Sequence, residues 1–173
     1  MKNKILGLST RAAILIMAIC ILLGVVLGNR NALNQATANA EKGFAEVAEG
    51  MKDRIGKAKT LLNKANEYIP GDEATKALID AIAQAEKAKG QKAVASADAK
   101  IANAAANVHQ ALPAAMSAAD QRYAVAAWDE LVSVDKQINR LKRNYNEGFQ
   151  EAIDVYRMLP ARWLLKNPEG VLI

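Results

Sequence analysis

A chain of 173 residues has room for one domain, and its single cysteine, Cys20, excludes a disulfide framework or a cysteine-based metal site. With 35 alanines, 5% aromatic residues and four prolines, the composition excludes a turn-rich all-β protein and favours long helices. Lys2, Lys4 and Arg11 supply three of the five net positive charges, and the remaining 20 basic residues face 18 acidic ones. No nucleic-acid partner is therefore expected.

The first predicted element is a membrane-spanning helix. Residues 12–28 form an uncharged run of 17 residues, at the short end of what crosses a bilayer. Lys2, Lys4 and Arg11 precede this run, so the positive-inside rule places the N-terminus in the cytoplasm. The bulk of the chain is then extracytoplasmic, in a periplasm, at the cell exterior or in an organelle lumen.

A cleaved secretory signal peptide is the alternative interpretation of this segment. Val26, Leu27 and Gly28 form an acceptable cleavage site. A lipoprotein site at Cys20 is disfavoured, because Ile19 precedes it where Gly or Ala is required. Both interpretations place the rest of the chain outside the cytoplasm, and we favour the uncleaved anchor.

The first long helix is predicted from residue 31 to residue 69, a stretch without proline. Its apolar residues recur at steps of three and four, which places them on one face of a helix. They are Phe44, Val47, Met51, Ile55, Ala58, Leu62, Ala65 and Ile69. Pro70 disfavours helix at the preceding residue, and Asp72 is placed to cap the next helix.

The second helix is predicted from residue 73 to residue 109. Alanine makes up 19 of the 46 residues from 74 to 119, which gives high helix propensity but few large core side chains. The large apolar residues are Leu78, Ile82, Val94, Ile101 and Val108. Gly90 is a weak point, and a break in this helix would give a fourth, shorter helix.

The third helix carries the clearest pattern. Ser117 and Asp120 resemble a capping box at its start, and Pro160 ends it. A heptad repeat of apolar and small residues runs between these ends. It comprises Leu131, Val134, Ile138, Leu141, Tyr145, Gly148, Ala152, Val155 and Leu159.

Together these elements predict an all-α fold, in which an N-terminal transmembrane helix is followed by an elongated up-down-up bundle of three long helices, or four. Residues 1–29 are expected to form a cytoplasmic N-tail and the anchor, and residues 30–160 the bundle. Residues 161–173 form an apolar tail that contains Trp163. This tail is expected to fold back on the bundle or to dock onto another subunit or a membrane.

The C-terminal third carries a recognisable set of residues: a helix with Ile138, a basic residue at Arg143, the pair Tyr145-Asn146, Tyr156 and Pro160, preceded by a break at 111–113. In these features it resembles the LemA family. The chain departs from the family in region 54–62, which stands where the family carries a double-basic motif. The resemblance implies a bacterial, membrane-anchored helical bundle that faces away from the cytoplasm, with some members in organelle membranes such as those of magnetosomes. It implies no catalytic site.

The residues that could carry chemistry are few. His109 is the only histidine and has no carboxylate three or four residues away, so a surface or capping role is expected. Glu147, Glu151 and Asp154 share a helix face without the Glu-x-x-His motif of di-metal bundles, and we interpret them as a solvated acidic face. We therefore expect no catalytic, cofactor-binding or metal-ligating residue, no cofactor and no enzymatic activity.

A small basic cluster precedes the Tyr-Asn pair. Arg140, Lys142 and Arg143 are expected on a solvated face, the alternative being a contact with lipid headgroups or an acidic partner. Tyr145 lies in the heptad and is expected in the core, where Asn146 beside it could bond a neighbouring helix.

The leading functional hypothesis is a membrane-anchored scaffold or assembly protein that self-associates, and the rival is an accessory binding module for another membrane protein. The expected partners are the lipid bilayer and other copies of this chain. Four alanines of the second helix are predicted to line a subunit contact or a tight helix–helix contact, because alanine permits close approach. They are Ala95, Ala99, Ala102 and Ala106.

Overall fold

The computed structural model describes the backbone of residues 10–160 and 162–173, and the side chains of residues 13–160 and 162–173. It contains four α-helices, and no strand occurs within those ranges, so the predicted all-α fold is confirmed. The helices are α1 (Thr10–Tyr68), α2 (Glu73–Lys87), α3 (Gln91–Ala111) and α4 (Ala118–Met158), with short 3-10 helices η1 (Leu112–Ala115) and η2 (Arg162–Leu164).

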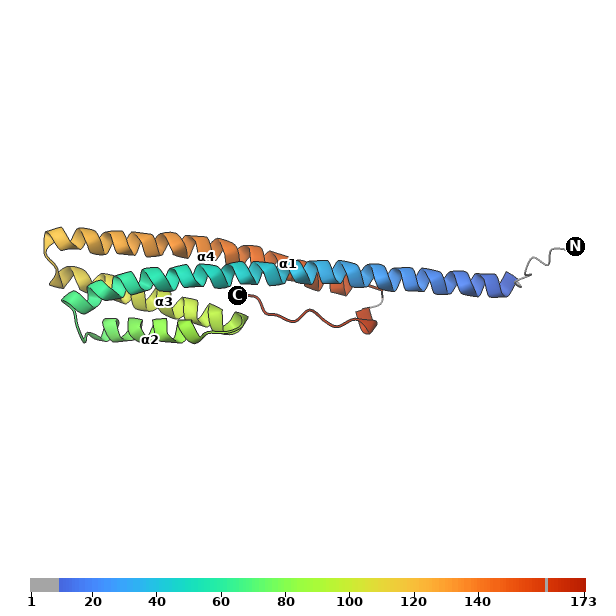
Figure 1. The fold of residues 1–173 in the computed structure, drawn as a ribbon, viewed down its shortest axis with the longest axis horizontal. Helices are drawn as coiled ribbons and strands as arrows, with labels where there is room; N and C mark the ends of the chain where they lie inside the picture. Colours follow the sequence, from blue (N-terminus) through green and yellow to red (C-terminus); the bar gives the residue numbers. More distant parts are fainter. Residues whose placement is uncertain (1–9, 161) are drawn as a thin grey trace, which may run out of the picture.

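Helix α1 is the longest element and runs without interruption through the apolar segment and into the bundle (Figure 1). Its 59 residues correspond to a length of about 88 Å. The N-terminal part extends beyond the other helices, and the remainder packs against them. The predicted anchor and the predicted first helix are therefore one continuous helix.

The helix predicted over residues 73–109 is divided into α2 and α3, which form an antiparallel hairpin (Figure 1). The chain turns at residues 88–90, where Ala88 is extended and Gly90 has φ +78°, a conformation that favours glycine. The five apolar residues predicted to face the core are buried, whereas Ile79 of α2 is 42% exposed. The turn lets both halves bury their apolar faces along one stretch of α1, and the result is an up-down-up-down bundle of four helices.

The ends of the helices follow the predicted signals. Helix α1 ends at Tyr68, just before Pro70, and the Asp72 side chain accepts a hydrogen bond from the Ala74 amide at the start of α2. The Ser117 side chain accepts from the Asp120 amide at the start of α4. The capping roles predicted for Asp72 and Ser117 are therefore confirmed.

Helices α1 and α4 form the main pair of the bundle, and they run antiparallel in close contact (Figure 1). In the α4 heptad, Leu131, Ile138 and Tyr145 are buried, as predicted. The helices approach each other closely at Gly43, where an added Cβ would lie 3.3 Å from Cα of Tyr145. Glycine in α1 therefore makes room for the large side chains of α4.

Candidate functional site

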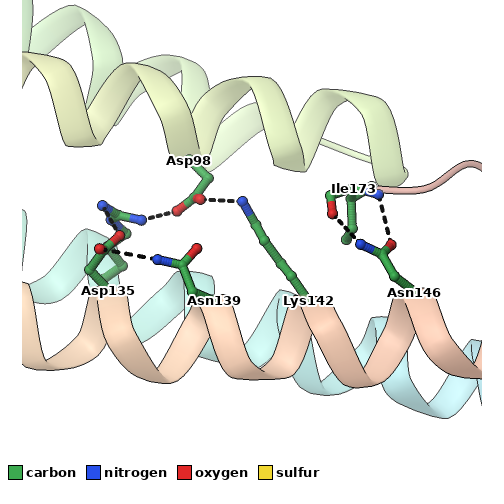
Figure 2. A network of polar contacts seen from close by, with 7 residues as sticks. Asp98, Asp135, Asn139, Lys142, Asn146 and Ile173 are labelled. Carbon is green, nitrogen blue, oxygen red and sulfur yellow. Dashed lines mark hydrogen bonds and ion pairs between the residues drawn. The ribbon is translucent and has the colours of Figure 1, made fainter.

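Four charged side chains from three helices form a network inside the bundle (Figure 2). Arg54 of α1 contacts Asp98 of α3 through Nη1, and its Nη2 lies 2.8 Å from Oδ1 of Asp135 on α4. Nζ of Lys142, also on α4, contacts the other carboxylate oxygen of Asp98. This buried charge network (Arg54, Asp98, Asp135 and Lys142) joins α1, α3 and α4 at one level.

The network is largely withdrawn from solvent. The side chains of Arg54 and Asp98 are 2% and 6% exposed, and those of Lys142 and Asp135 are 16% and 36% exposed. Two cations face two carboxylates, which meets the requirement that a buried ion has a partner. Removal of any one side chain would leave a charge uncompensated in the interior. The arrangement is suited to fixing the register of three helices.

The sequence contains a signal for Arg54 that the predicted apolar stripe overlooked. Met51, Arg54 and Ala58 continue the steps of three and four, so Arg54 lies on the buried face. The prediction that Lys142 lies on a solvated face is wrong, because its side chain reaches inward to Asp98. Its neighbour Arg143 is exposed, as is Arg140, as predicted.

A second polar arrangement binds the C-terminal tail to α4. The Tyr145 hydroxyl donates a hydrogen bond of 2.9 Å to the Val171 carbonyl. The Asn146 side chain donates to the Ile173 carbonyl at 2.6 Å and accepts from the Ile173 amide at 2.9 Å (Figure 2). Burial raises the pKa of Tyr145, so the phenol stays protonated and remains a donor.

Tyr145 and Asn146, which we call the tail-binding pair, belong to the set of residues that resembles the LemA family. The core position predicted for Tyr145 is confirmed, since its side chain is 1% exposed. Asn146 bonds the tail rather than a neighbouring helix. Both hydrogen bonds of Asn146 go to one backbone residue, so the pair fixes the tail in one register whatever side chain stands at position 173.

The tail packs along α1 and α4 beyond the end of the α2–α3 hairpin (Figure 1). Residues 166–169 lie beside residues 33–41 of α1. A Cβ added at Gly170 would come within 2.6 Å of the Phe149 ring, so the backbone rests directly on that ring. A cavity of about 90 Å³ remains between α1, α4 and the tail. The tail therefore covers the part of the α1–α4 pair that the hairpin does not reach.

The N-terminal part of α1 presents an uninterrupted apolar surface. Residues 13–28 are exposed except Val26, which is half-exposed. Within the described residues, α1 is the one helix long and apolar enough to cross a membrane, with a mean hydropathy of 2.3 over its most apolar window and none of that window buried. Lys2 and Lys4, on which the predicted orientation depends, lie outside the described residues, as does the Arg11 side chain.

The remaining candidate residues lie apart from these two arrangements. His109 of α3 stacks on Trp128 of α4, with ring centroids 4.4 Å apart and planes within 6°. Glu147 and Glu151 are exposed, and Asp154 accepts a hydrogen bond from Gln150. His109 is therefore engaged with an aromatic ring between two helices.

The four alanines singled out in α3 are not among its buried residues. Ala99 is exposed, and the other three are half-buried. The inner face of α3 instead consists of Val94, Ala97, Asp98, Ile101, Ala104, Ala105 and Val108. The predicted contact of these alanines with another subunit stays a prediction.

A comparison of the chain with protein-family models finds no match, and a comparison with curated proteins finds none either.

Proposed function

We propose that this protein is a membrane-anchored scaffold that holds a rigid helical bundle at the outer side of a membrane and self-associates there. The observation that carries this proposal is the continuity of α1, which leads from an exposed apolar segment into the bundle core. An unbroken helix transmits the orientation of its membrane-spanning part to the domain, whereas a flexible linker would not. Such a junction suits a protein that presents a surface at a fixed height.

Self-association is supported by one flank of α3, beside its buried face. Ala95, Ala99, Ala102 and Ala106 recur at steps of four, three and four, so they form one stripe of small side chains. Small residues on a helix permit another helix to approach closely. A membrane anchor also confines copies of the chain to two dimensions, which raises their local concentration.

The size of the assembly in native membranes tests this proposal. Ala99→Glu combined with Ala102→Glu adds two charges to the stripe, and we expect a smaller assembly after mild detergent extraction, with unchanged helical content. Ala45→Glu combined with Ala126→Glu is the matched control, because both alanines are exposed on other helices. A normal assembly in the α3 variant, or a monomeric wild type, would contradict self-association. Co-purification of one different protein would then favour the accessory-module hypothesis.

We propose the extracytoplasmic orientation on the basis of the three N-terminal cations. Single cysteines introduced into a Cys20→Ser background test it. Ala36 is buried, so Ala38, which is exposed, is the better labelling site next to the membrane, with Asn3 for the opposite side. Labelling of residue 38 from the cytoplasm would contradict the orientation, and a mature N-terminus at Asn29 would contradict the uncleaved anchor.

We further propose that the chain is a divergent relative of the LemA family. The structural roles of two residues that carry the resemblance support this proposal. Tyr145 and Asn146 bind the C-terminal tail through three hydrogen bonds. Binding the tail is a structural role, and such a role fits a family without a catalytic site.

A further inference from the structure

The packing of α4 against α1 sets the height at which α4 ends. Gly148 of α4 faces Ala40 of α1, and an added Cβ at Gly148 would lie 3.9 Å from the Ala40 Cα. The helices run antiparallel, so Met158, about ten residues further along α4, lies level with Arg30, about 15 Å nearer the N-terminal end. The uncharged run of α1 ends at Gly28. The end of α4 therefore lies at the height where α1 would leave a bilayer.

Large apolar side chains are exposed at this height. Met158, Trp163 and Leu164 are 75%, 77% and 56% exposed. Met158 is the last residue of α4, and Trp163 and Leu164 belong to η2, the short helix that follows it (Figure 1). We call these three residues the proximal patch. Tryptophan is enriched at the level of the lipid headgroups, where its ring contacts acyl chains and its N–H stays hydrated.

Exposed cations lie in the same stretch of chain and on α1 at the same height. Arg30, Arg157, Arg162 and Lys166 are all exposed, and the last is 82% exposed. Asp154 lies 3.9 Å from Arg157, and Glu169 pairs with Lys166. Glu147 and Glu151, which share a groove with Met158, precede it on α4 and so lie further from the apolar segment. Arg30, Arg157 and Arg162 are the charges nearest the height where α1 would leave a bilayer, and they suit the phosphates of an anionic leaflet.

We propose that the proximal patch and its cations form a second membrane contact, in which Trp163 and Leu164 enter the headgroup region of an anionic leaflet and Arg157, Arg162 and Lys166 bind lipid phosphates. This inference rests on the proposed function, because it requires α1 to be the membrane anchor. The bundle would then contact one leaflet twice, through α1 and through the proximal patch. Two contacts fix the tilt of the bundle, whereas one helix alone would leave the tilt free.

The two tryptophans of the chain provide a matched pair of probes. The Trp128→Phe variant reports on Trp163 alone, and the Trp163→Phe variant reports on Trp128, which lies about 45 Å further from the membrane along α4. Each full-length variant is reconstituted into phosphatidylcholine–phosphatidylglycerol vesicles, with and without bromine on the acyl chains. We expect Trp163 emission to be blue-shifted and largely lost to brominated lipid, and Trp128 emission to be unaffected. Arg162→Gln with Lys166→Gln should reduce the loss at Trp163.

The native Cys20 distinguishes failure of the anchor from failure of the second contact. It is exposed in the apolar part of α1, so insertion would shield it from a charged, membrane-impermeant maleimide. Aqueous iodide serves as a second quencher, which reaches only tryptophans in contact with water. If Cys20 is shielded while Trp163 is quenched by iodide and not by brominated lipid, the second contact alone is overturned. A blue-shifted Trp163 that neither quencher reaches also overturns it, because the patch is then covered by protein. A Cys20 that reacts with the maleimide overturns the anchor. If brominated lipid also fails to quench Trp163 in the same sample, both the anchor and the second contact are overturned.

Discussion

The α1–α4 pair is covered in two different ways along its length. At the end far from the apolar segment, the α2–α3 hairpin covers it, with a core of aliphatic side chains and the buried charge network. Nearer the apolar segment, the extended tail takes the place of the hairpin and is held by hydrogen bonds from Tyr145 and Asn146. The first region depends on burial and paired charges between helices, and the second on a few hydrogen bonds to an irregular backbone.

This difference implies a gradient of stability along the bundle. Opening the four-helix region exposes a large buried apolar area to water, which costs a large free energy. A tail held by a few contacts opens at a lower free energy. The changes below are measured on the full-length chain in detergent micelles by urea unfolding and far-UV circular dichroism. They run from the largest expected effect to the smallest.

The largest effect is expected in the α1–α4 core. Ile138 is fully buried, so Ile138→Asp places an unpaired charge in the interior and should cost about 5 kcal/mol, enough to unfold a marginally stable bundle. Gln137→Asp, at the exposed adjacent position, is the control and should leave the unfolding midpoint nearly unchanged. Equal, mild effects of both substitutions would show that α4 does not pack through this heptad.

The buried charge network should respond next. Asp98→Ala leaves Arg54 and Lys142 without a shared partner and should cost about 3–4 kcal/mol. The control is Glu86→Ala, which breaks the exposed Lys59–Glu86 pair and should cost less than about 1 kcal/mol. If Asp98→Ala were as mild as the control, the network would not hold the hairpin region together.

Lys142→Asp is a direct test of the corrected position of Lys142. It places a second carboxylate against Asp98 and should cost about 2–3 kcal/mol, where a solvated position would give only about half a kcal/mol. Arg143→Asp, one residue further and exposed, should have little effect. Similar unfolding midpoints for the two variants would restore the original prediction of a solvated face.

The tail region should show a smaller and local effect. Asn146→Ala removes both hydrogen bonds to residue 173 and should cost about 1–2 kcal/mol. Amide exchange in the tail should rise while exchange in α2 and α3 is unchanged, because the hairpin does not depend on this contact. Gln150→Ala, on the exposed surface of α4, is the control. A uniform rise in exchange along the whole chain would contradict the separation of the two regions.

The smallest effect compares two glycines of α1. Gly56 has open space around it, so Gly56→Ala should stabilise the helix by about 0.5–1 kcal/mol. Gly43→Ala should bring no gain, because the added methyl group presses on the Tyr145 backbone. An equal gain from both substitutions would mean that α1 and α4 are further apart at Gly43 than described.

The sequence was sufficient for the features that depend on repeated patterns. The apolar periodicity predicted the helices and the α4 heptad, and the capping residues predicted where α2 and α4 begin. The turn at Gly90 was anticipated only as a weak point, because local propensity does not reveal that both halves of residues 73–109 find a better burial site as a hairpin. Tertiary packing decided that feature.

The polar arrangements were harder to predict for a related reason. Arg54 is buried only because Asp98 and Asp135 reach it from positions distant in the sequence, and no local pattern links the three. Its position within the apolar stripe was the available signal. The partner of Asn146 was likewise unpredictable, since it is the backbone of a tail 27 residues away.

The continuity of α1 from the membrane into the bundle is the central claim, and a nitroxide scan of residues 20–40 in vesicles tests it most directly. Each position is labelled singly in a Cys20→Ser background, except position 20 itself, and its accessibility to oxygen and to an aqueous relaxation agent is measured. We predict lipid exposure up to residue 28 and, beyond residue 30, an alternation between buried and aqueous positions that keeps the helical period of 3.6 residues. Loss of the period between residues 28 and 33, or aqueous exposure of residues 20–25, would contradict the account.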